Sequence, residues 1–279
     1  MTRSIDLTAV LLVYNEEINL PHALDNVQNF AREIVIVDSL STDKSVDIAK
    51  DYGCRIYQRK FDNFSGQRNF ALQQVHYDTE WIFILDADEI LTDELKDEIC
   101  QTLEKTHFDA FFIKRRFFWM GQWIRRGYYP TWLLRLGRVG TLVCDERPIN
   151  EHLVCTTGKV GRLREDFIDH NRKSLSDWLD KHNRYSSLEA QVLLENRSSS
   201  EHYRFFASQY ERKRWISAKI WNQLPPLVRP FIYFFYRYFF CLGFLDGRKA
   251  FAYHFLHAFF YRVIIDLKYL EKKWLGNKK

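Results

Sequence analysis

Short apolar runs alternate with amphipathic stretches along the first part of the chain. The runs are almost wholly hydrophobic, as expected of strands that are buried on both faces of a sheet. They predict strands at residues 7–14, 33–38, 55–58, 81–85 and 110–115. Helical spacing predicts helices at residues 15–27, 43–52, 67–75, 92–105 and 174–195, the first with Asn15 as its N-cap. Strands that alternate with helices indicate parallel strand pairs joined by right-handed crossovers.

Carboxylates stand at the ends of three of these strands. Glu16 and Glu17 follow the first strand, Asp38 ends the second, and Asp86 and Asp88 follow the run WIFIL. In open α/β sheets, ligands bind beyond the carboxyl ends of the strands. None of these strands is followed by a glycine-rich phosphate loop. One strand-end aspartate alone is as readily a cap or a solvated charge, so the joint occurrence carries the prediction.

Asp86 and Asp88 are two residues apart. If that segment is extended, both side chains point to the same side and face one cavity. Clustered carboxylate oxygens bind hard cations such as Mg²⁺ or Mn²⁺, which keep open positions for phosphates. The spacing therefore predicts a metal that holds a diphosphate where a phosphate loop is missing.

Charge and aromatic content divide the chain into two parts. Residues 204–279 hold 15 Lys and Arg against 4 Asp and Glu, whereas the whole chain has a net charge of +5. The apolar stretch 230–245 is interrupted by Arg237 and is shorter than the roughly 20 residues that a membrane span needs. Aromatic and basic side chains favour the bilayer interface, so we expect peripheral membrane association. Packing in a homo-oligomer interface is the alternative.

The remaining composition limits the compartment and the partners. Five cysteines form no CxxC pair, which indicates reduced thiols in a cytoplasmic protein. Together with the basic rear, this predicts a location on the cytoplasmic side of a membrane. No recognised nucleic-acid motif is present, so nucleic acid is not an expected partner.

The motifs VLLVYNEEINL, IVIVDSLSTDKSVDIA, GQRNFAL and WIFILDADE, in this order and spacing, resemble those of family 2 glycosyltransferases. The resemblance implies the GT-A fold, a Rossmann-like α/β mixed sheet that binds a nucleotide-diphospho-sugar. It also implies inversion by a single displacement, assisted by Mg²⁺ or Mn²⁺. The implied donor-binding residues are Tyr14, Asn15, Glu16, Glu17, Asp38, Arg68, Asp86, Ala87 and Asp88.

The resemblance also assigns roles. Asp38 would contact the base or ribose, and Asp86 and Asp88 would form the DxD pair, with Asp88 as a metal ligand. His170 is expected as a second metal ligand or a phosphate contact. Glu151 is the expected catalytic base, since a carboxylate with a raised pKa can take the acceptor proton. Reserve candidates are Asp145 and Glu146 for the base, and Arg125, Arg126 and Arg135 for phosphate binding.

The second half of the chain resembles a narrower subset of the family. NEHL, SLSDWLDKHNRYSSLEA, GFLDGRKAF and LKYLEKKW are similar to segments of bacterial lipopolysaccharide-core β-1,4-glucosyltransferases, although Asn150 stands where that subset usually has His. This implies transfer of a hexose, glucose from UDP-glucose, onto a lipid-linked saccharide. The expected domains are a catalytic domain at 1–200, with donor half 1–115 and acceptor half 116–200, and a C-terminal helical region at 201–279.

Three other functions remain open from the sequence. The first is a transferase with the same donor site and a polyprenyl-phosphate acceptor. The second is a non-catalytic, membrane-bound nucleotide-binding adaptor, against which the intact Asp38, Asp86 and Asp88 argue. The third is a nucleotidyltransferase, whose phosphate loop is missing here.

Overall fold

The computed structural model describes residues 5–145, 152–195 and 221–276. They fall into two compact units. The first contains residues up to Trp123 and Tyr128–Lys173, and the second contains Ile124–Gly127 and the chain from Ser174 onward. The domain boundary expected at residue 200 lies outside the described residues.

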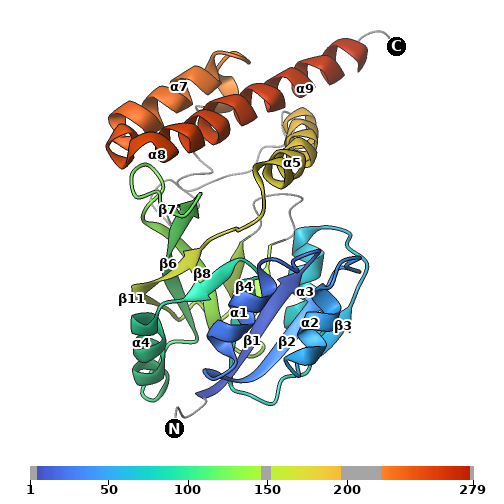
Figure 1. Ribbon diagram of the computed structural model, residues 1–279, viewed down its shortest axis with the longest axis vertical. Helices are drawn as coiled ribbons and strands as arrows, with labels where there is room; N and C mark the ends of the chain where they lie inside the picture. Colours follow the sequence, from blue (N-terminus) through green and yellow to red (C-terminus); the bar gives the residue numbers. More distant parts are fainter. Residues whose placement is uncertain (1–4, 146–151, 196–220, 277–279) are drawn as a thin grey trace. The chain divides into compact units, whose positions relative to one another are not determined.

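The described residues of the first unit form a nine-stranded sheet (Figure 1). The strand order is β3-β2-β1-β4-β8-β6-β11-β5, with β7 paired to β6. The strands are β1 (Ile5–Val13), β2 (Ala31–Asp38), β3 (Arg55–Gln58), β4 (Trp81–Asp86), β5 (Glu89–Leu91), β6 (Ala110–Trp119), β7 (Gln122–Trp123), β8 (Thr131–Arg138) and β11 (Val160–Asp169). A separate two-stranded ladder joins β9 (Leu142–Cys144) to β10 (Leu153–Cys155).

The sheet is mixed, as the GT-A fold requires. β1, β2, β3 and β4 pair in parallel, which confirms the βαβ pattern of the first half. β8 is antiparallel to both β4 and β6, and β5 is antiparallel to β11, whereas β11 and β6 are parallel. The α/β GT-A architecture is therefore confirmed, with a first half that is parallel and a second half that is not.

Four helices, α1 (Leu20–Val27), α2 (Ser45–Asp51), α3 (Phe64–Gln74) and α4 (Asp93–Leu103), connect these strands. Alternate residues of β1 belong to two separate apolar clusters: Leu11 is in the cluster that includes Leu24 of α1, and Val10 is in the cluster that includes Leu72 of α3. Apolar packing on both faces explains why β1 and β4 are continuous hydrophobic runs.

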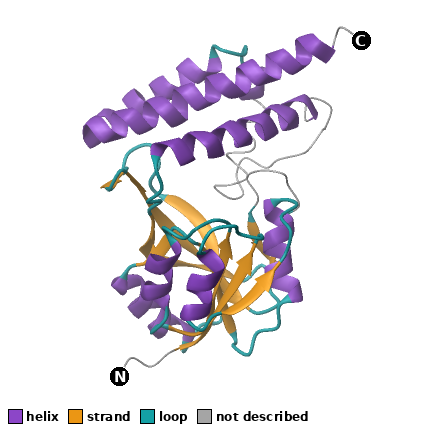
Figure 2. Ribbon diagram, turned by 45° about the vertical axis from the view of Figure 1, so that its right-hand side comes forward, coloured by secondary structure: helices purple, strands orange, loops and turns teal. Residues whose placement is uncertain are grey.

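The second unit is helical. Its described elements are α5 (Leu175–Glu195), η2 (Trp221–Gln223), α7 (Arg229–Phe235), η3 (Tyr236–Phe240), η4 (Gly243–Asp246), α8 (Gly247–Tyr253), η5 (His254–Phe260) and α9 (Tyr261–Gly276). α8, η5 and α9 follow one another without a break, so they form one long helical segment (Figure 2). Among the described helices, none is both long and apolar enough to cross a bilayer.

Ion pairs and hydrogen bonds join the helices of this unit. Asp266 of α9 binds Arg229 of α7, with both side chains buried. Glu189 of α5 accepts hydrogen bonds from Tyr261 at 2.7 Å and from Arg262 at 2.8 Å. The C-terminal helical region expected from the sequence is therefore an ordered packing unit, and α5 is part of it.

Candidate functional site

Three strand ends that carry carboxylates meet at one edge of the sheet. Val13 of β1 pairs in register with Asp38, the last residue of β2. On the other side of β1, Leu12 pairs with Asp86, the last residue of β4. The segments that follow β1, β2 and β4 therefore start side by side, as the sequence predicts.

Asp86 is held by two arginines. Arg68 of α3 donates to it at 3.0 Å, and Arg135 of β8 donates at 2.8 Å. Burial alone would raise the pKa of Asp86, but the charges of Arg135 and Arg68 outweigh it and hold the pKa well below its usual range. Arg68 and Arg135 both form ion pairs with the Asp86 carboxylate and so fix the end of β4. The carboxylate therefore has little capacity left to bind a metal cation.

Arg135 also binds a second buried carboxylate. Its Nη2 lies 2.5 Å from Oε1 of Glu89, and the other carboxylate oxygen of Glu89 accepts from the backbone N–H of Asp86. Burial raises the pKa of Glu89, and the nearby carboxylates of Asp86 and Asp169 add to this rise. Arg135 was expected as a candidate phosphate ligand, but it is only 5% exposed and is committed to these carboxylates.

Asp88 has a different environment. The two residues Ala87 and Asp88 form a turn between β4 and β5, so the extended geometry expected for the DxD segment is wrong. Asp88 is half-buried, and its carbonyl oxygen accepts the backbone N–H of His170 at 2.9 Å. Asp88 and His170, the two expected metal ligands, are therefore neighbours across this backbone hydrogen bond.

The chemistry of this pair suits a divalent cation. Burial lowers the pKa of His170, and the positive charge of Arg172 lowers it further, which favours the neutral imidazole that coordinates metals. Asp88 supplies a carboxylate oxygen beside it. No cluster of three or more metal-binding side chains occurs among the described residues, so phosphate oxygens and water would have to complete the coordination shell.

Glu16 lies at the same edge of the sheet and binds a lysine that is distant in sequence. Lys173, four residues after the end of β11, places its Nζ 2.7 Å from Glu16 Oε1, and Asn19 donates to the other oxygen at 2.8 Å. Burial raises the pKa of Glu16, while the hydrogen bonds from Lys173 and Asn19 oppose the rise. Lys173 and Arg172 thus bring positive charge to a site that has no glycine-rich loop.

The loop after β1 is fixed against the loop after β2. Asn15 has a positive φ of 53°, its N–H donates to Ser41, and its side-chain oxygen accepts from the N–H of Thr42. The expected N-cap role of Asn15 is wrong, because α1 begins at Leu20 and Asn15 joins two loops instead. Tyr14, next to it, is 48% exposed.

Glu17 and Asp38 accept hydrogen bonds that stabilise the same two loops. The Glu17 carboxylate accepts from the N–H of Lys44 at 3.2 Å. Asp38 is fully buried and accepts hydrogen bonds from Ser41 and from Gln58 at 3.0 Å. The contact of Asp38 with a base or ribose therefore stays a prediction, beside an observed role in shaping the loop that follows it.

The other expected residues have different partners or lie outside the described residues. Glu151 and Glu146 lie outside the described residues, so their expected roles stay predictions. Asp145 accepts the N–H of His152 and, through its carbonyl oxygen, the hydroxyl of Ser65. Arg126 binds Asp246 within the helical unit.

Glu89, Arg172 and Lys173 belong to the site but were not predicted from the sequence. Glu89 directly follows DAD in the chain, and its position beside two aspartates was a signal that it belongs to the same cluster. Arg172 and Lys173 carry no comparable signal, because their position depends on the pairing of β11 with β5.

The chain is similar in sequence to several known proteins. The family described as Glycosyl transferase family 2 matches residues 8–167. The lipopolysaccharide core biosynthesis glycosyltransferase LpsC of Rhizobium meliloti is 30% identical over 217 residues, which are 73% of this chain and 77% of LpsC. A glycosyltransferase of Rickettsia bellii is 38% identical over 93 residues, and the match covers only 31% of that relative's length.

A solved structure is also similar. The crystal structure of S. aureus TarS in complex with UDP-GlcNAc aligns with a TM-score of 0.47 and 14% identity. The alignment covers 97% of this chain and 92% of that one.

Proposed function

The chain belongs to glycosyltransferase family 2, and on that premise we propose that it moves a hexose from a UDP-sugar onto a lipid-linked saccharide. The reaction is a single displacement at the anomeric carbon with inversion. Glucose from UDP-glucose is the proposed donor group, and the oligosaccharide core of a lipopolysaccharide is the proposed acceptor. The printed name of LpsC, a relative at 30% identity, supports this acceptor class.

The observation that carries the proposal is the position of Asp88 beside His170 at the edge where β1, β2 and β4 end. Among the described residues, these two combine a partly exposed carboxylate with an imidazole whose lowered pKa keeps it neutral. In this proposal Asp88 and His170 hold Mg²⁺ or Mn²⁺. The ion would neutralise charge that builds up on the departing diphosphate.

The neighbouring side chains have supporting roles. Arg172 is directed at the same region, since the charge of Asp88 acts on its guanidinium, and it would bind a phosphate oxygen. Lys173 opposes the rise that burial causes in the pKa of Glu16, at the same edge of the sheet. Asp86 and Arg68 fix the end of β4 so that the Ala87–Asp88 turn presents Asp88 toward the donor.

The acceptor half of the site rests on Glu151, which stays a prediction. A carboxylate there would take the proton of the attacking hydroxyl while the bond between the sugar and the diphosphate breaks. Asp145 is less suited to the role, because its carboxylate already accepts the N–H of His152.

The test is a transfer assay with UDP-[¹⁴C]glucose and Mn²⁺. Purified core-lipid acceptor is compared with polyprenyl phosphate, using the wild type, Glu151→Gln and the matched control Glu195→Gln. The proposal expects label in the core lipid with the wild type and with Glu195→Gln, and a loss of roughly 100-fold or more with Glu151→Gln. Label in polyprenyl phosphate alone would show that polyprenyl phosphate, not the core lipid, is the acceptor. Transfer to neither acceptor would refute the proposal.

A further inference from the structure

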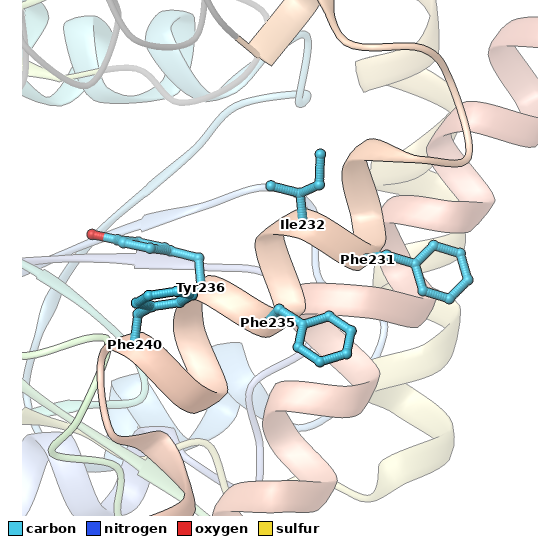
Figure 3. Close-up of a pocket in the computed structure, with 5 residues that line it drawn as sticks. All are labelled: Phe231, Ile232, Phe235, Tyr236 and Phe240. Atoms are coloured by element: carbon cyan, nitrogen blue, oxygen red, sulfur yellow. The ribbon is translucent and has the colours of Figure 1, made fainter.

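One face of the α7–η3 segment consists of exposed apolar side chains. Phe231, Phe235 and Phe239 recur at intervals of four residues, and each is about half exposed. Ile232, Tyr236 and Phe240 form a second row beside them, and Phe240 is 82% exposed. Figure 3 shows side chains of both rows lining a shallow pocket along this segment. A contiguous apolar surface of this kind marks an interaction site.

The face continues onto the neighbouring helical segment. Phe234 links the two, because its ring lies 6.4 Å from that of Phe251 and 6.5 Å from that of Phe255. Phe251 and Phe255 are themselves 46% and 42% exposed. At the turn between the segments, Phe244 and Leu245 of η4 are also exposed. We call the exposed apolar side chains of residues 231–255 the aromatic face.

A rigid back supports this face. A side chain at Gly243 would place its Cβ 2.5 Å from Nε2 of buried His254, so only glycine lets the η4 turn pack there. Asp246 accepts hydrogen bonds from both the backbone and the guanidinium of Arg126 at 2.7 Å. The turn is therefore held in place, and its apolar side chains are directed outward by the packing behind them.

The exposed charged side chains between residues 221 and 270 are all basic. Between residues 221 and 270 the acidic residues are Asp246 and Asp266, and both are buried in ion pairs with arginines. Arg248 and Lys249, in contrast, are exposed directly after Phe244 and Leu245. The surface thus offers aromatic side chains bordered by positive charge.

We propose that the aromatic face binds the surface of a bilayer that contains anionic lipids. Phe240 and Leu245 enter the boundary between headgroups and acyl chains, and Arg248 and Lys249 contact lipid phosphates. Charge complementarity favours this occupant over the same face of a second copy of the chain, since two basic borders would repel each other and no exposed acidic side chain lies between residues 221 and 270. Binding to a bilayer is compatible with the lipid-linked acceptor of the proposed function, but the proposal rests on separate observations.

Vesicle co-sedimentation of the full chain, without donor or acceptor, tests the proposal separately from catalysis. Vesicles of phosphatidylcholine alone are compared with vesicles that also contain phosphatidylglycerol. We expect the wild type to bind the anionic vesicles more tightly and to lose affinity as salt increases. Phe240→Ser with Leu245→Ser should lower the partition coefficient at least about tenfold, since two apolar anchors are removed.

Two further variants separate the contributions. Leu188→Ser on α5 replaces a leucine that is 45% exposed, against 53% for Leu245, and that lies outside the aromatic face, so this variant should bind like the wild type. Arg248→Gln with Lys249→Gln should weaken binding to anionic vesicles several-fold and leave binding to neutral vesicles unchanged. The far-UV circular dichroism spectrum and the urea unfolding midpoint of each variant, compared with the wild type, show whether it is folded.

Two results would overturn the proposal. One is wild-type affinity for anionic vesicles in the Phe240→Ser, Leu245→Ser variant. The other is a wild type that ignores vesicles but sediments as a dimer, with the same two substitutions giving a monomer, because the aromatic face would then be covered by a second copy.

Discussion

The backbone N–H of His170 donates a hydrogen bond to the carbonyl oxygen of Asp88, with the two atoms 2.9 Å apart. This bond extends the antiparallel ladder between β11 and β5, in which Asp169 pairs with Glu89. The second aspartate of the DxD segment is therefore positioned by a strand that lies about 80 residues later in the chain. The proposed metal site depends on that pairing.

His170→Ala should weaken metal binding while nucleotide binding without metal stays unchanged. Loss of an outer-shell partner of a metal ligand already costs roughly 10–100-fold in metal affinity, and removal of the ligand itself should cost at least as much. Electron paramagnetic resonance titration of Mn²⁺ in the presence of UDP measures the affinity. His76→Ala, in an 84% exposed side chain, is the matched control. Equal Mn²⁺ affinity in wild type and His170→Ala would remove His170 from the site.

Arg135→Ala should destabilise the fold strongly. Glu89 is buried, Asp86 is partly buried, and both bind the same guanidinium, so the substitution leaves the buried Glu89 carboxylate without its cation. A loss of about 3–5 kcal/mol in the free energy of unfolding is expected. Urea unfolding followed by circular dichroism measures it, with the exposed Arg164→Ala as the control, expected within about 0.5 kcal/mol of wild type. A similar small change for Arg135→Ala would show that the cluster does not stabilise the sheet.

The helical unit should lose stability in acid through its buried histidines. Burial lowers the pKa of His254 to about 4, and the charge of Arg237 adds to the effect. Burial likewise lowers the pKa of His182 to about 4. Because the unfolded chain binds these protons near pH 6.5, the stabilisation is present above that pH and is lost as pH falls toward 4.

For His254 alone, the loss at pH 4 is on the order of 3 kcal/mol. His254→Gln removes that titration, so its unfolding free energy should depend less steeply on pH between 6.5 and 4, whatever its absolute stability. Chemical unfolding at several pH values provides the slopes. Identical slopes for the two proteins would contradict the prediction.

Lys173→Met should weaken UDP binding. The substitution removes the ammonium partner of Glu16 and a positive charge near the predicted diphosphate site. Loss of one charge-assisted contact corresponds to an affinity loss of about tenfold or more. Fluorescence titration with UDP at pH 7 measures it, with Lys50→Met as a control in a side chain that is 62% exposed. Unchanged UDP affinity would limit Lys173 to a structural role.

The first half of the fold could be predicted because its signals are local. β1 and β4 are buried on both faces, so their sequences are continuous apolar runs that end at the carboxylates of the site. β11 lacks such a signal: Arg162 is exposed, and Asp166 is buried only because Lys114 and Arg116 of β6 neutralise it. Because the side chains that neutralise Asp166 come from β6, which is distant in sequence, the sequence of β11 alone shows no clear strand pattern.

The candidate site could be predicted only in part for the same reason. The aspartates of the DxD segment were found from their spacing, but their different environments depend on Arg68, Arg135 and His170, which come from three other elements. The spacing suggested two equivalent carboxylates. In the structure, Arg68 and Arg135 form ion pairs with Asp86, whereas Asp88 lies in the turn between β4 and β5.

The most direct test is the heat of UDP binding to the wild type and to Asp88→Ala, each with Mn²⁺ and with a chelator. Asp51→Ala, in an exposed helix-end aspartate, serves as the control. A metal-dependent glycosyltransferase should bind UDP tightly only with Mn²⁺, keep this behaviour in Asp51→Ala and lose it in Asp88→Ala. UDP binding of equal strength with Mn²⁺ and with chelator, unchanged in Asp88→Ala, would contradict the role of Asp88 and the metal-assisted mechanism.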